Sequence, residues 1–307
     1  MRIGAGLDTD GTVDDVVNRA KRLAATGIDS MWSAQIFGHD TLTVLAIAGR
    51  QVADQFPDVE VGTSVVPVQP RHPMMLAAQG LTVQDACRGH FTLGIGLSHQ
   101  MVVEGVWGLS FDRPVRYMRE YLSILVPLLA GEQVSFVGEL LRTSTIGPLD
   151  VVAATPVQVL VAALGPSMLR LTGELADGTT TWMTGASTIE EHVVPAISAA
   201  AQKAGRRAPR IVVNVPVCIT ASPDEARDEA AKTFAIYGHL PSYRAMLDRE
   251  GLQGPADLAI VGDEEHVRSK IGAFAEAGAT DLIGTVFGSS EKRWRTVEFL
   301  GQLAREK

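Results

Sequence analysis

Strand-like and helix-like stretches alternate along the whole of this 307-residue chain, and this alternation is the strongest constraint on its fold. The strand-like stretches are short and apolar, and the stretches between them are amphipathic with helical spacing. Strands that alternate with helices form a parallel sheet with helical crossovers. Eight such units in about 300 residues favour a closed (β/α)8 barrel over an open doubly wound sheet. We therefore predict an α/β fold, a TIM barrel that occupies residues 1–307 as one domain.

The predicted barrel strands are Arg2–Leu7, Ile28–Ser33, Val59–Val66, His90–Ile95, Val157–Ala163, Thr179–Met183, Ile211–Thr220 and Asp281–Phe287. Two segments interrupt the alternation. Residues 131–156 contain a hairpin pattern, Gln133–Phe136 with Leu140–Thr143, and residues 237–262 contain an additional helix over Pro241–Glu250. We expect both segments to be small insertions at the barrel mouth that cover the site.

The composition argues against several classes of function. The formal net charge is −8 and no basic stripe occurs, so a nucleic-acid partner is not expected. Cys87 and Cys218 lie in apolar surroundings without metal-ligand spacing, so we expect two buried thiols and no metal site. No apolar run approaches about 18 residues, and the chain starts in a strand-like stretch rather than a leader. We predict a cytoplasmic protein with a small-molecule substrate and no membrane contact.

Small-residue loops follow two neighbouring predicted strands in the stretch Ala162–Gly185. The backbone N–H groups of Leu164-Gly165 precede a predicted helix, for which Ser167 is the expected cap. The second loop is Thr184-Gly185-Ala186. Because N–H groups at helix N-termini bind anions, the two loops indicate a cofactor phosphate site. The alternative is that Gly165 and Gly185 are only turn glycines, since short glycine-containing loops carry little information.

The carboxyl ends of barrel strands carry the active site in this kind of fold, and they define the residues to examine. These are Asp8, Gln35, Ser64–Gln69, Leu97–His99, Leu164–Gly165, Thr184–Gly185 and the loop after Phe287.

Several short motifs follow one another in a specific order. They are Gly62-Thr63-Ser64-Val65, Arg71-His72-Pro73, Leu93-Gly94-Ile95-Gly96, Arg113-Pro114, Glu120-Tyr121-Leu122, Ala163-Leu164-Gly165-Pro166, Ala176-Asp177-Gly178 and Gly278-Ala279-Thr280-Asp281. In this order and spacing they resemble the bacterial luciferase-like flavin and deazaflavin oxidoreductases. The resemblance is closest to the deazaflavin branch, which includes methylenetetrahydromethanopterin reductase, and it covers essentially the whole chain.

This resemblance implies a flavin-like ring in the barrel mouth. It implies a non-proline cis peptide bond at Ser64–Val65, directly after Thr63, which pushes backbone against one face of the ring. The cofactor phosphate would lie over Gly96-Leu97-Ser98 and Ala163-Leu164-Gly165, with Thr184-Gly185-Ala186 adjoining. The implied cofactor is coenzyme F420, an 8-hydroxy-5-deazaflavin, and FMN is the alternative. The relatives usually pair through barrel helices, so a homodimer is implied as well.

The acid–base residues of these relatives are not simply present in this chain. Deazaflavin dehydrogenases often carry Asp-His after the second strand, where this chain has Ala34-Gln35. The strand-one acid of methylenetetrahydromethanopterin reductase corresponds to Gly6, and Asp8 lies two residues further on. His99 stands where other relatives carry an acid. The substrates of the relatives therefore do not transfer to this chain.

His99, Gln35 and Asp8 are the candidates for the catalytic chemistry. Imidazole titrates near neutrality, so His99 is a candidate general acid, or else a loop histidine that contacts the cofactor. Gln35 can hydrogen-bond a ring carbonyl or the substrate but exchanges no proton near pH 7. Asp8 either enters the mouth or caps the following turn. His39-Asp40 either restores the missing pair or supplies a cap, Asp40, to the next helix.

These observations favour an F420-dependent oxidoreductase that transfers a hydride between C5 of the cofactor and a small organic substrate. Reduction of the substrate is favoured because the Asp-His pair is missing. One alternative is a reduced-FMN-dependent monooxygenase of the same fold. The other is a non-catalytic protein that retains the cofactor pocket.

Overall fold

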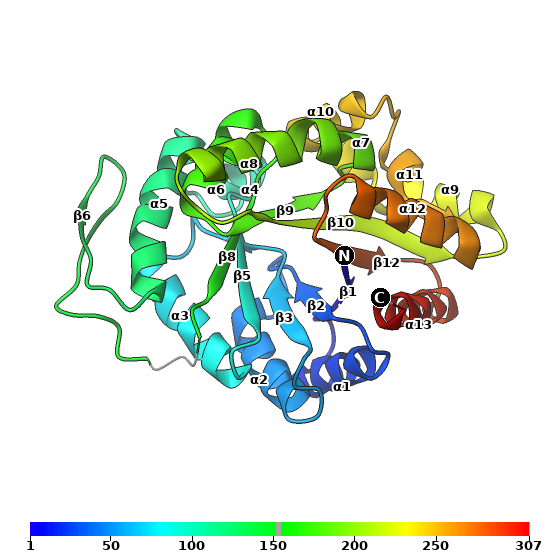
Figure 1. Cartoon of the computed structure of the whole chain (residues 1–307), viewed down its shortest axis with the longest axis horizontal. Helices are drawn as coiled ribbons and strands as arrows, with labels where there is room; N and C mark the ends of the chain where they lie inside the picture. Colours follow the sequence, from blue (N-terminus) through cyan, green and yellow to red (C-terminus); the bar gives the residue numbers. More distant parts are fainter. Residues whose placement is uncertain (152–154, 307) are drawn as a thin grey trace.

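The computed structural model describes residues 1–151 and 155–306, and its centre is a closed barrel of eight parallel strands (Figure 1). The strands pair in the order β1–β2–β3–β5–β8–β9–β10–β12, and β12 pairs with β1 to close the barrel. Their bounds are β1 Arg2–Gly6, β2 Ser30–Ser33, β3 Glu60–Thr63, β5 Phe91–Gly96, β8 Gln158–Ala162, β9 Gly178–Trp182, β10 Arg210–Ile219 and β12 Asp281–Val286. The predicted (β/α)8 class and all of its strands are confirmed, with small shifts at the strand ends.

Helices surround the barrel (Figure 1). They are α1 Val13–Ala25, α2 Thr41–Ala53, α3 Pro73–Ala86, α5 Pro114–Leu129, α6 Pro166–Leu175, α8 Val194–Lys203, α9 Pro223–Thr233, α12 Glu264–Glu276 and α13 Ser290–Arg305. Side chains of Thr12, Asp40, Asp263 and Ser289 accept a backbone N–H from the first turns of α1, α2, α12 and α13. Asp40 is therefore a helix cap. No helix among the described residues is long and apolar enough to cross a membrane.

The predicted capping role of Ser167 is wrong. Gly165 occupies the N-cap position of α6, and Pro166 begins the helix. Proline suits this first position because its missing N–H would have no partner within the helix. The Ser167 hydroxyl instead accepts a hydrogen bond from Arg170 at 3.1 Å.

The segment from residue 234 to residue 262 lies over the carboxyl ends of β9 and β12, as predicted for an insertion at the mouth. It contains η2 Ala235–Gly238, α10 Pro241–Arg249, α11 Pro255–Leu258 and β11 Ile260–Gly262. Phe234 and Leu247 of this segment share one apolar cluster with Met183, which follows β9, and Phe287, which follows β12. We call residues 234–250 the lid segment.

The predicted hairpin forms but does not cover the mouth, so that part of the prediction is wrong. Its strands are β6 Ser135–Val137 and β7 Arg142–Ser144, and they stand outside α5 in Figure 1. Glu120 of α5 accepts the backbone N–H groups of residues 139–141, which fixes the turn to the outer helices. Residues 152–154 of the predicted insertion lie outside the described residues.

The inward-facing side chains form layers along the barrel axis, because alternate residues of a strand face the same side. The middle layer is a buried apolar cluster of Trp32, Leu160, Val212 and Ile283. Two positions earlier on the same strands lie Ser30, Gln158, Arg210 and Asp281. Two positions later lie Ala34, Ala162, Asn214 and Thr285. The barrel therefore has a charged amino end and a carboxyl end of small and polar side chains.

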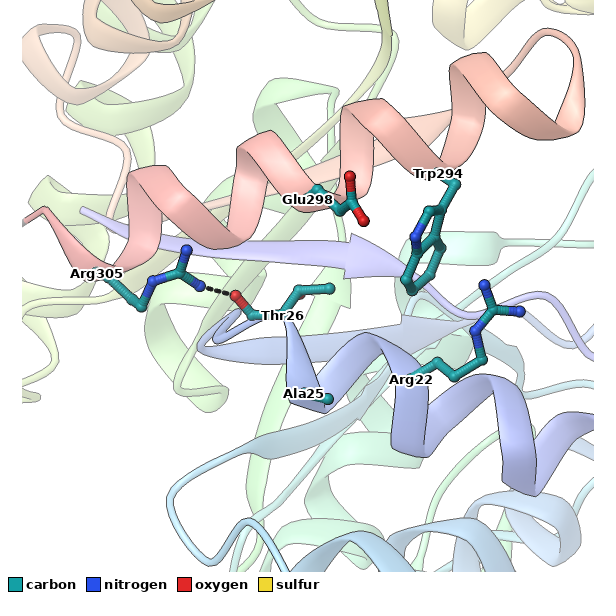
Figure 2. A pocket seen from close by; sticks show the side chains of 6 residues that line it. All are labelled: Arg22, Ala25, Thr26, Trp294, Glu298 and Arg305. Carbon is teal, nitrogen blue, oxygen red and sulfur yellow. Dashed lines mark hydrogen bonds between the residues drawn. The ribbon is translucent and has the colours of Figure 1, made fainter.

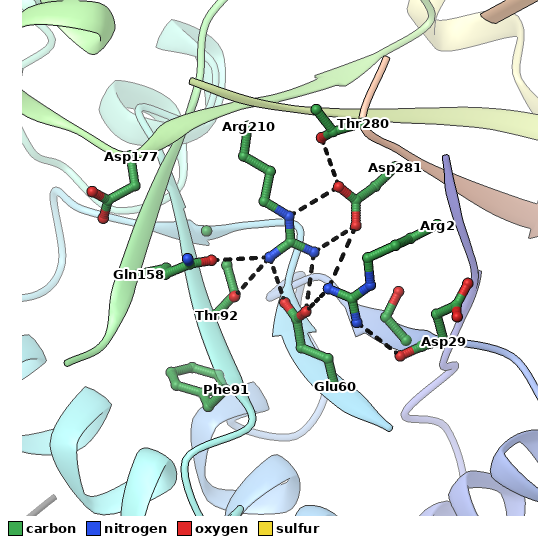
Figure 3. Close-up of polar contacts among 12 residues, drawn as sticks. Arg2, Asp29, Glu60, Phe91, Thr92, Gln158, Asp177, Arg210, Thr280 and Asp281 are labelled. Carbon is green, nitrogen blue, oxygen red and sulfur yellow. Dashed lines mark hydrogen bonds and ion pairs between the residues drawn. The ribbon is translucent and has the colours of Figure 1, made fainter. Parts of the chain in front are cut away.

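The charged amino end is a network of paired groups (Figure 3). Arg210 pairs with Glu60 at 2.7 Å and with Asp281 at 2.6 Å, and Arg2 also pairs with Glu60. Burial acts to raise the pKa values of Glu60 and Asp281, but the pairing with Arg210 outweighs it and holds both below their ordinary values. The charges at this end are therefore satisfied within the chain, although Arg2, Glu60 and Arg210 also line a hollow there. A ligand is expected at the carboxyl end, where active sites of this kind of barrel lie.

Candidate active site at the barrel mouth

The third barrel strand is interrupted by a bulge where it reaches the mouth. Gly62 of β3 pairs with Thr92 of β5, and Val66 of β4 (Val66–Pro67) pairs with Ile95. The β3–β4 side therefore holds one residue more than β5 between these pairs. The Ser64–Val65 peptide bond inside the bulge is cis, as the resemblance implied.

Two glycines of β5 make room for the bulge. A Cβ atom at Gly94 would overlap the carbonyl oxygen of Thr63, and one at Gly96 would lie 2.7 Å from Val65 Cγ2. The Thr63 hydroxyl donates to the Gly94 carbonyl and accepts from the Gly94 N–H, both at 2.8 Å, and Thr63 is fully buried. The predicted cofactor contact of Thr63 therefore needs correction, because its hydroxyl is used to hold the bulge against β5.

Small side chains line the mouth between β1 and β8. Ala34 and Ala162 are exposed although they continue central barrel strands, and Gly6 and Ser64 are half-buried. The Ser64 hydroxyl lies 3.3 Å from that of Thr180 on β9. The barrel is therefore open above its middle layer on this side, next to the bulge. We call this region the small-residue side of the mouth.

Two of the predicted phosphate loops present backbone at the mouth. Gly165 is exposed at the N-cap of α6 without a side-chain cap, and a Cβ atom there would meet no other atom within 4 Å. The neighbouring Leu164 carbonyl contacts His192 Nε2 at 2.8 Å. Leu97 and Ser98, which follow β5, are half-buried, and Ser98 has a left-handed φ of 59°. Phosphate binding at these loops stays a prediction that this geometry suits.

The third predicted loop, Thr184-Gly185-Ala186, already faces an anionic side chain of the protein. A Cβ atom at Gly185 would overlap the carboxyl group of Glu250, and Glu250 Oε1 accepts the Thr188 N–H at 2.6 Å. Thr184 is fully buried. We therefore remove this loop from the predicted phosphate site, because a carboxylate takes the place that a phosphate would need.

Gln35 and Asp8 are both engaged within the protein. Gln35 Oε1 accepts the Thr41 N–H at 2.8 Å, and its Nε2 donates to the His39 carbonyl at 3.2 Å. Asp8 is exposed and forms an ion pair with Arg293 of α13. Gln35 thus shapes the loop after β2, and the charge of Asp8 is paired. Neither geometry supports the catalytic roles predicted for them.

His99 differs from these two residues because its imidazole forms no hydrogen bond with any described residue. It follows β5, at the N-cap position of α4 (Gln100–Gly105), and it is half-buried. Burial lowers the pKa of His99 below its ordinary value of 6.5, so the imidazole is neutral at pH 7. A neutral imidazole offers one acceptor nitrogen and one N–H donor. His99 is therefore the candidate that can exchange a proton with a ligand.

An aromatic wall on the β9–β12 side of the mouth was missed by the sequence reasoning. Its rings pack edge to face, with centroids of neighbouring rings 5.2 to 5.8 Å apart. The centroid of the Tyr243 ring also lies 5.7 Å from that of the His99 ring. The members of the wall are Trp182, Phe234, Tyr237, Tyr243 and Phe287. Trp182 ends β9 and Phe287 follows β12, whereas the lid segment supplies the other three. Their spacing in the sequence gives no periodic signal, since tertiary packing brings them together.

A second groove lies on the outer surface of the barrel, between α1 and α13 and away from the mouth (Figure 2). The Arg22 guanidinium lies over the Trp294 ring, 4.2 Å from its centroid, and Arg305 donates to the Thr26 carbonyl. None of the predicted site residues lines this groove. Within the described ranges, no group of three His, Cys, Asp or Glu side chains could hold a metal ion.

The sequence as a whole was compared with known protein families. Residues 1–281 match the family model described as luciferase-like monooxygenase. The chain belongs to this family. The bulged third strand and the open mouth of the luciferase-like barrel described above agree with the resemblance seen in its motifs.

Relatives of this luciferase-like protein differ in what their names state. An uncharacterized protein of Mycobacterium tuberculosis is 29% identical over 303 residues, covering 90% of this chain and 88% of the relative. The 5,10-methylenetetrahydromethanopterin reductase of Methanolobus tindarius is 27% identical, covering 85% and 78%. The F420-dependent glucose-6-phosphate dehydrogenase of Nakamurella multipartita is 28% identical, covering 77% and 74%.

Solved structures with the luciferase-like fold include enzymes of two cofactor classes. The F420-dependent tetrahydromethanopterin reductase of Methanopyrus kandleri superimposes with a TM-score of 0.80 at 20% identity, covering 98% of both chains. The oxygenating constituent of 3,6-diketocamphane monooxygenase from Pseudomonas putida, in complex with FMN, superimposes with a TM-score of 0.76 at 18% identity, covering 100% and 99%. These likenesses confirm the fold.

The luciferase-like mouth fits a flavin-like cofactor on observations of this structure. The bulge and the small side chains beside it leave an open space for a planar ring. The exposed backbone at Gly165 and the loop Gly96–Ser98 offer N–H groups for a phosphate. These residues suit the ring and phosphate that F420 and FMN have in common.

Proposed function

We propose that this protein is an F420-dependent oxidoreductase that acts on an alcohol–carbonyl couple of a small organic substrate, with His99 exchanging the proton. The observation that carries the proposal is the unbonded, half-buried imidazole of His99 at the mouth. The F420-dependent enzymes among the relatives and the structural neighbours support the choice of cofactor.

Each part of the mouth has one task in this proposal. The bulge at Ser64–Val65 supports the ring, and the loops Gly96–Ser98 and Ala163–Gly165 hold the phosphate. Bound F420 supplies hydride transfer at C5. His99 takes a proton from the substrate hydroxyl at its unprotonated ring nitrogen.

The protonation state of His99 sets how the rate of each direction depends on pH. Because burial lowers its pKa, the neutral form predominates at pH 7, and this form accepts a proton from an alcohol. Carbonyl reduction needs the protonated form, so its rate rises as the pH falls. We therefore expect alcohol oxidation to be faster at neutral than at acid pH, and carbonyl reduction, the direction that the missing Asp-His pair suggested, to be faster at acid pH.

The direct experiment supplies the purified protein with F420 and a panel of alcohols, and follows F420 reduction by absorbance. We expect F420 to be bound at micromolar concentration and to be reduced when an alcohol is present. Absence of F420 fluorescence quenching on mixing would overturn the choice of cofactor. Binding without any hydride transfer would favour a non-catalytic binding protein.

A reduced-FMN-dependent monooxygenase is the second candidate, because an FMN-bound monooxygenase shares the fold. The absorption spectrum of the protein purified from its native host distinguishes the two chromophores. Oxygen uptake that depends on reduced FMN, with no binding of F420, would favour the monooxygenase.

A further inference from the structure

Three guanidinium groups near the mouth are paired with groups of the protein itself. Asp8 pairs with Arg293, and Asp40 pairs with Arg71 at 2.6 Å. In the lid segment, Arg244 donates to Asp248 at 2.8 Å and also to backbone carbonyls of residues 252 and 253. These guanidinium groups are therefore committed to partners within the protein, which leaves them poorly suited to hold an anionic substrate.

The aromatic wall offers a different kind of contact. It runs from Phe287 through Phe234, Trp182 and Tyr237 to Tyr243, whose ring packs edge to face with His99. Phe234 and Phe287 are buried, so the half-buried rings of Trp182, Tyr237 and Tyr243 are the ones that a ligand can contact. Ring-bearing ligands gain both apolar burial and edge-to-face geometry from such a surface. Because the wall ends at the proposed proton acceptor, a ring held against Tyr243 would place its substituent close to His99.

Glu250 adds a negative charge at the edge of this wall. Its carboxylate covers Gly185, three residues beyond Trp182, and accepts the Thr188 N–H at 2.6 Å. Thr188 is buried, and its hydroxyl has no partner among the described residues. The carboxylate thus occupies the N-terminus of the helical run that starts at α7 (Ala186–Thr188), where an anionic ligand would otherwise be stabilised.

We infer that the mouth takes a ring-bearing substrate without negative charge, and that Glu250 is the specificity-determining residue that rejects anionic ones. This inference rests on the proposed function for the chemistry that follows binding. The selection itself depends on residues of this chain alone, namely Glu250 and the aromatic wall. Tyr243 supplies the ring contact, and the Glu250 carboxylate, which lies beside Gly185 just after β9, adds a negative charge that disfavours a second anion.

The test compares two probes that have the same ring and nearly the same size, benzamide and benzoate. Their dissociation constants are measured by ligand-observed NMR on the full chain, with and without F420. For the wild type we expect benzamide to bind about tenfold or more tightly than benzoate, a difference of about 1.4 kcal/mol. Equal binding of the two probes, or no binding of benzamide, would overturn the inference.

Matched variants test whether the preference for the neutral probe comes from Glu250. Glu250→Gln keeps an oxygen that can accept the Thr188 N–H but removes the charge, and we expect it to narrow the preference to about threefold or less. Glu190→Gln removes the same charge from an exposed site on the same helical run and should leave the preference as in the wild type. The same change in both variants would contradict a specific role for Glu250.

A third variant tests whether the aromatic wall binds the ring of the probe. Tyr243→Leu keeps an apolar side chain but removes the ring, and we expect benzamide binding to weaken about tenfold. Unchanged benzamide affinity would show that the probe binds elsewhere and would overturn the inference. If F420 fails to bind while the probe preference holds, the proposed function fails and the substrate class stands.

Discussion

The two ends of the barrel are built from the same strands but differ in the side chains that they carry. At the amino end, Arg210, Glu60 and Asp281 occupy the first positions of β10, β3 and β12 and satisfy one another's charges. At the carboxyl end, the same barrel presents Ala34 and Ala162, which leave space, and an aromatic wall. The charges of one end are satisfied within the chain, and the other end presents small side chains and aromatic rings to a ligand.

Stability depends mainly on the amino end, and ligand binding depends mainly on the carboxyl end. Removing a partner at the amino end leaves a buried charge uncompensated, and this cost falls on the folded state. Removing a side chain from the mouth leaves few buried polar groups without a hydrogen-bond partner, because the side chains of this layer are small and partly exposed. Substitutions at the amino end should therefore change stability, and substitutions at the mouth should change binding and catalysis.

The largest expected effect is that of Arg210→Ala. Glu60 and Asp281 would remain buried without their main partner, and we expect a loss of about 3–5 kcal/mol in the free energy of unfolding. Urea denaturation measures it. Arg207→Ala, an exposed residue three positions earlier, is the control and should change stability by less than about 0.5 kcal/mol. Similar losses in both variants would contradict the assigned role of the network.

The second effect belongs to the mouth. His99→Asn removes the group that exchanges the proton, and we expect kcat to fall about hundredfold while F420 affinity and the urea midpoint stay close to wild type. In the wild type, alcohol oxidation should rise with pH until it passes the lowered pKa of His99 and then level off. A variant that retains full activity with the same pH profile would remove His99 from the mechanism.

Acid should destabilise the amino end. Glu60 and Asp281 have pKa values below their ordinary 4.5 and 3.8, so they bind fewer protons in the folded than in the unfolded protein. Their stabilising contribution is present above those ordinary values and is lost as the pH falls through and below them. Urea midpoints between pH 7 and pH 3 measure this loss. In Arg210→Ala the unpaired carboxylates gain from protonation, so its deficit should shrink as the pH falls.

The smallest effect comes from a matched pair of buried threonines. Thr92 accepts a hydrogen bond from Arg210 at 3.2 Å. Among the described residues, the Thr180 side chain has one hydrogen-bond partner, the Ser64 hydroxyl at 3.3 Å, near the mouth. We expect Thr92→Val to cost about 1–2 kcal/mol and Thr180→Val less than about 0.5 kcal/mol, because hydrogen bonds to charged groups are stronger. Urea denaturation of both variants measures these losses. Equal losses in the two variants would contradict the stronger hydrogen bonding assigned to the amino end.

The strands were predictable because their apolar, β-branched runs are local signals. Val157–Ala163 could be recognised without any partner, and the Asp40 cap could be recognised from one residue before a helix. The cis bond at Ser64–Val65 came from resemblance, since no local preference of serine or valine indicates it. The residues that engage Thr63 and Gln35 lie 31 and 6 positions away, so their structural use was less visible than their place at the mouth.

Features made by long-range contacts were not predictable from local patterns. The position of the hairpin depends on Glu120, a carboxylate about 20 residues from the N–H groups that it accepts. The aromatic wall joins Trp182 to rings of the lid segment more than 50 residues later. Glu250 and Thr188 are likewise 62 positions apart. In each case packing, rather than sequence pattern, decides which groups meet.

In the proposed function the small-residue side of the mouth holds F420, and a larger side chain in that space should block the cofactor. F420 fluorescence quenching is measured for the wild type and for Ala162→Leu, with urea denaturation of both as the control for folding. We predict saturable micromolar binding by the wild type and loss of binding in Ala162→Leu with a nearly unchanged urea midpoint. Absence of binding by the wild type, or equal affinity in the variant, would contradict the account.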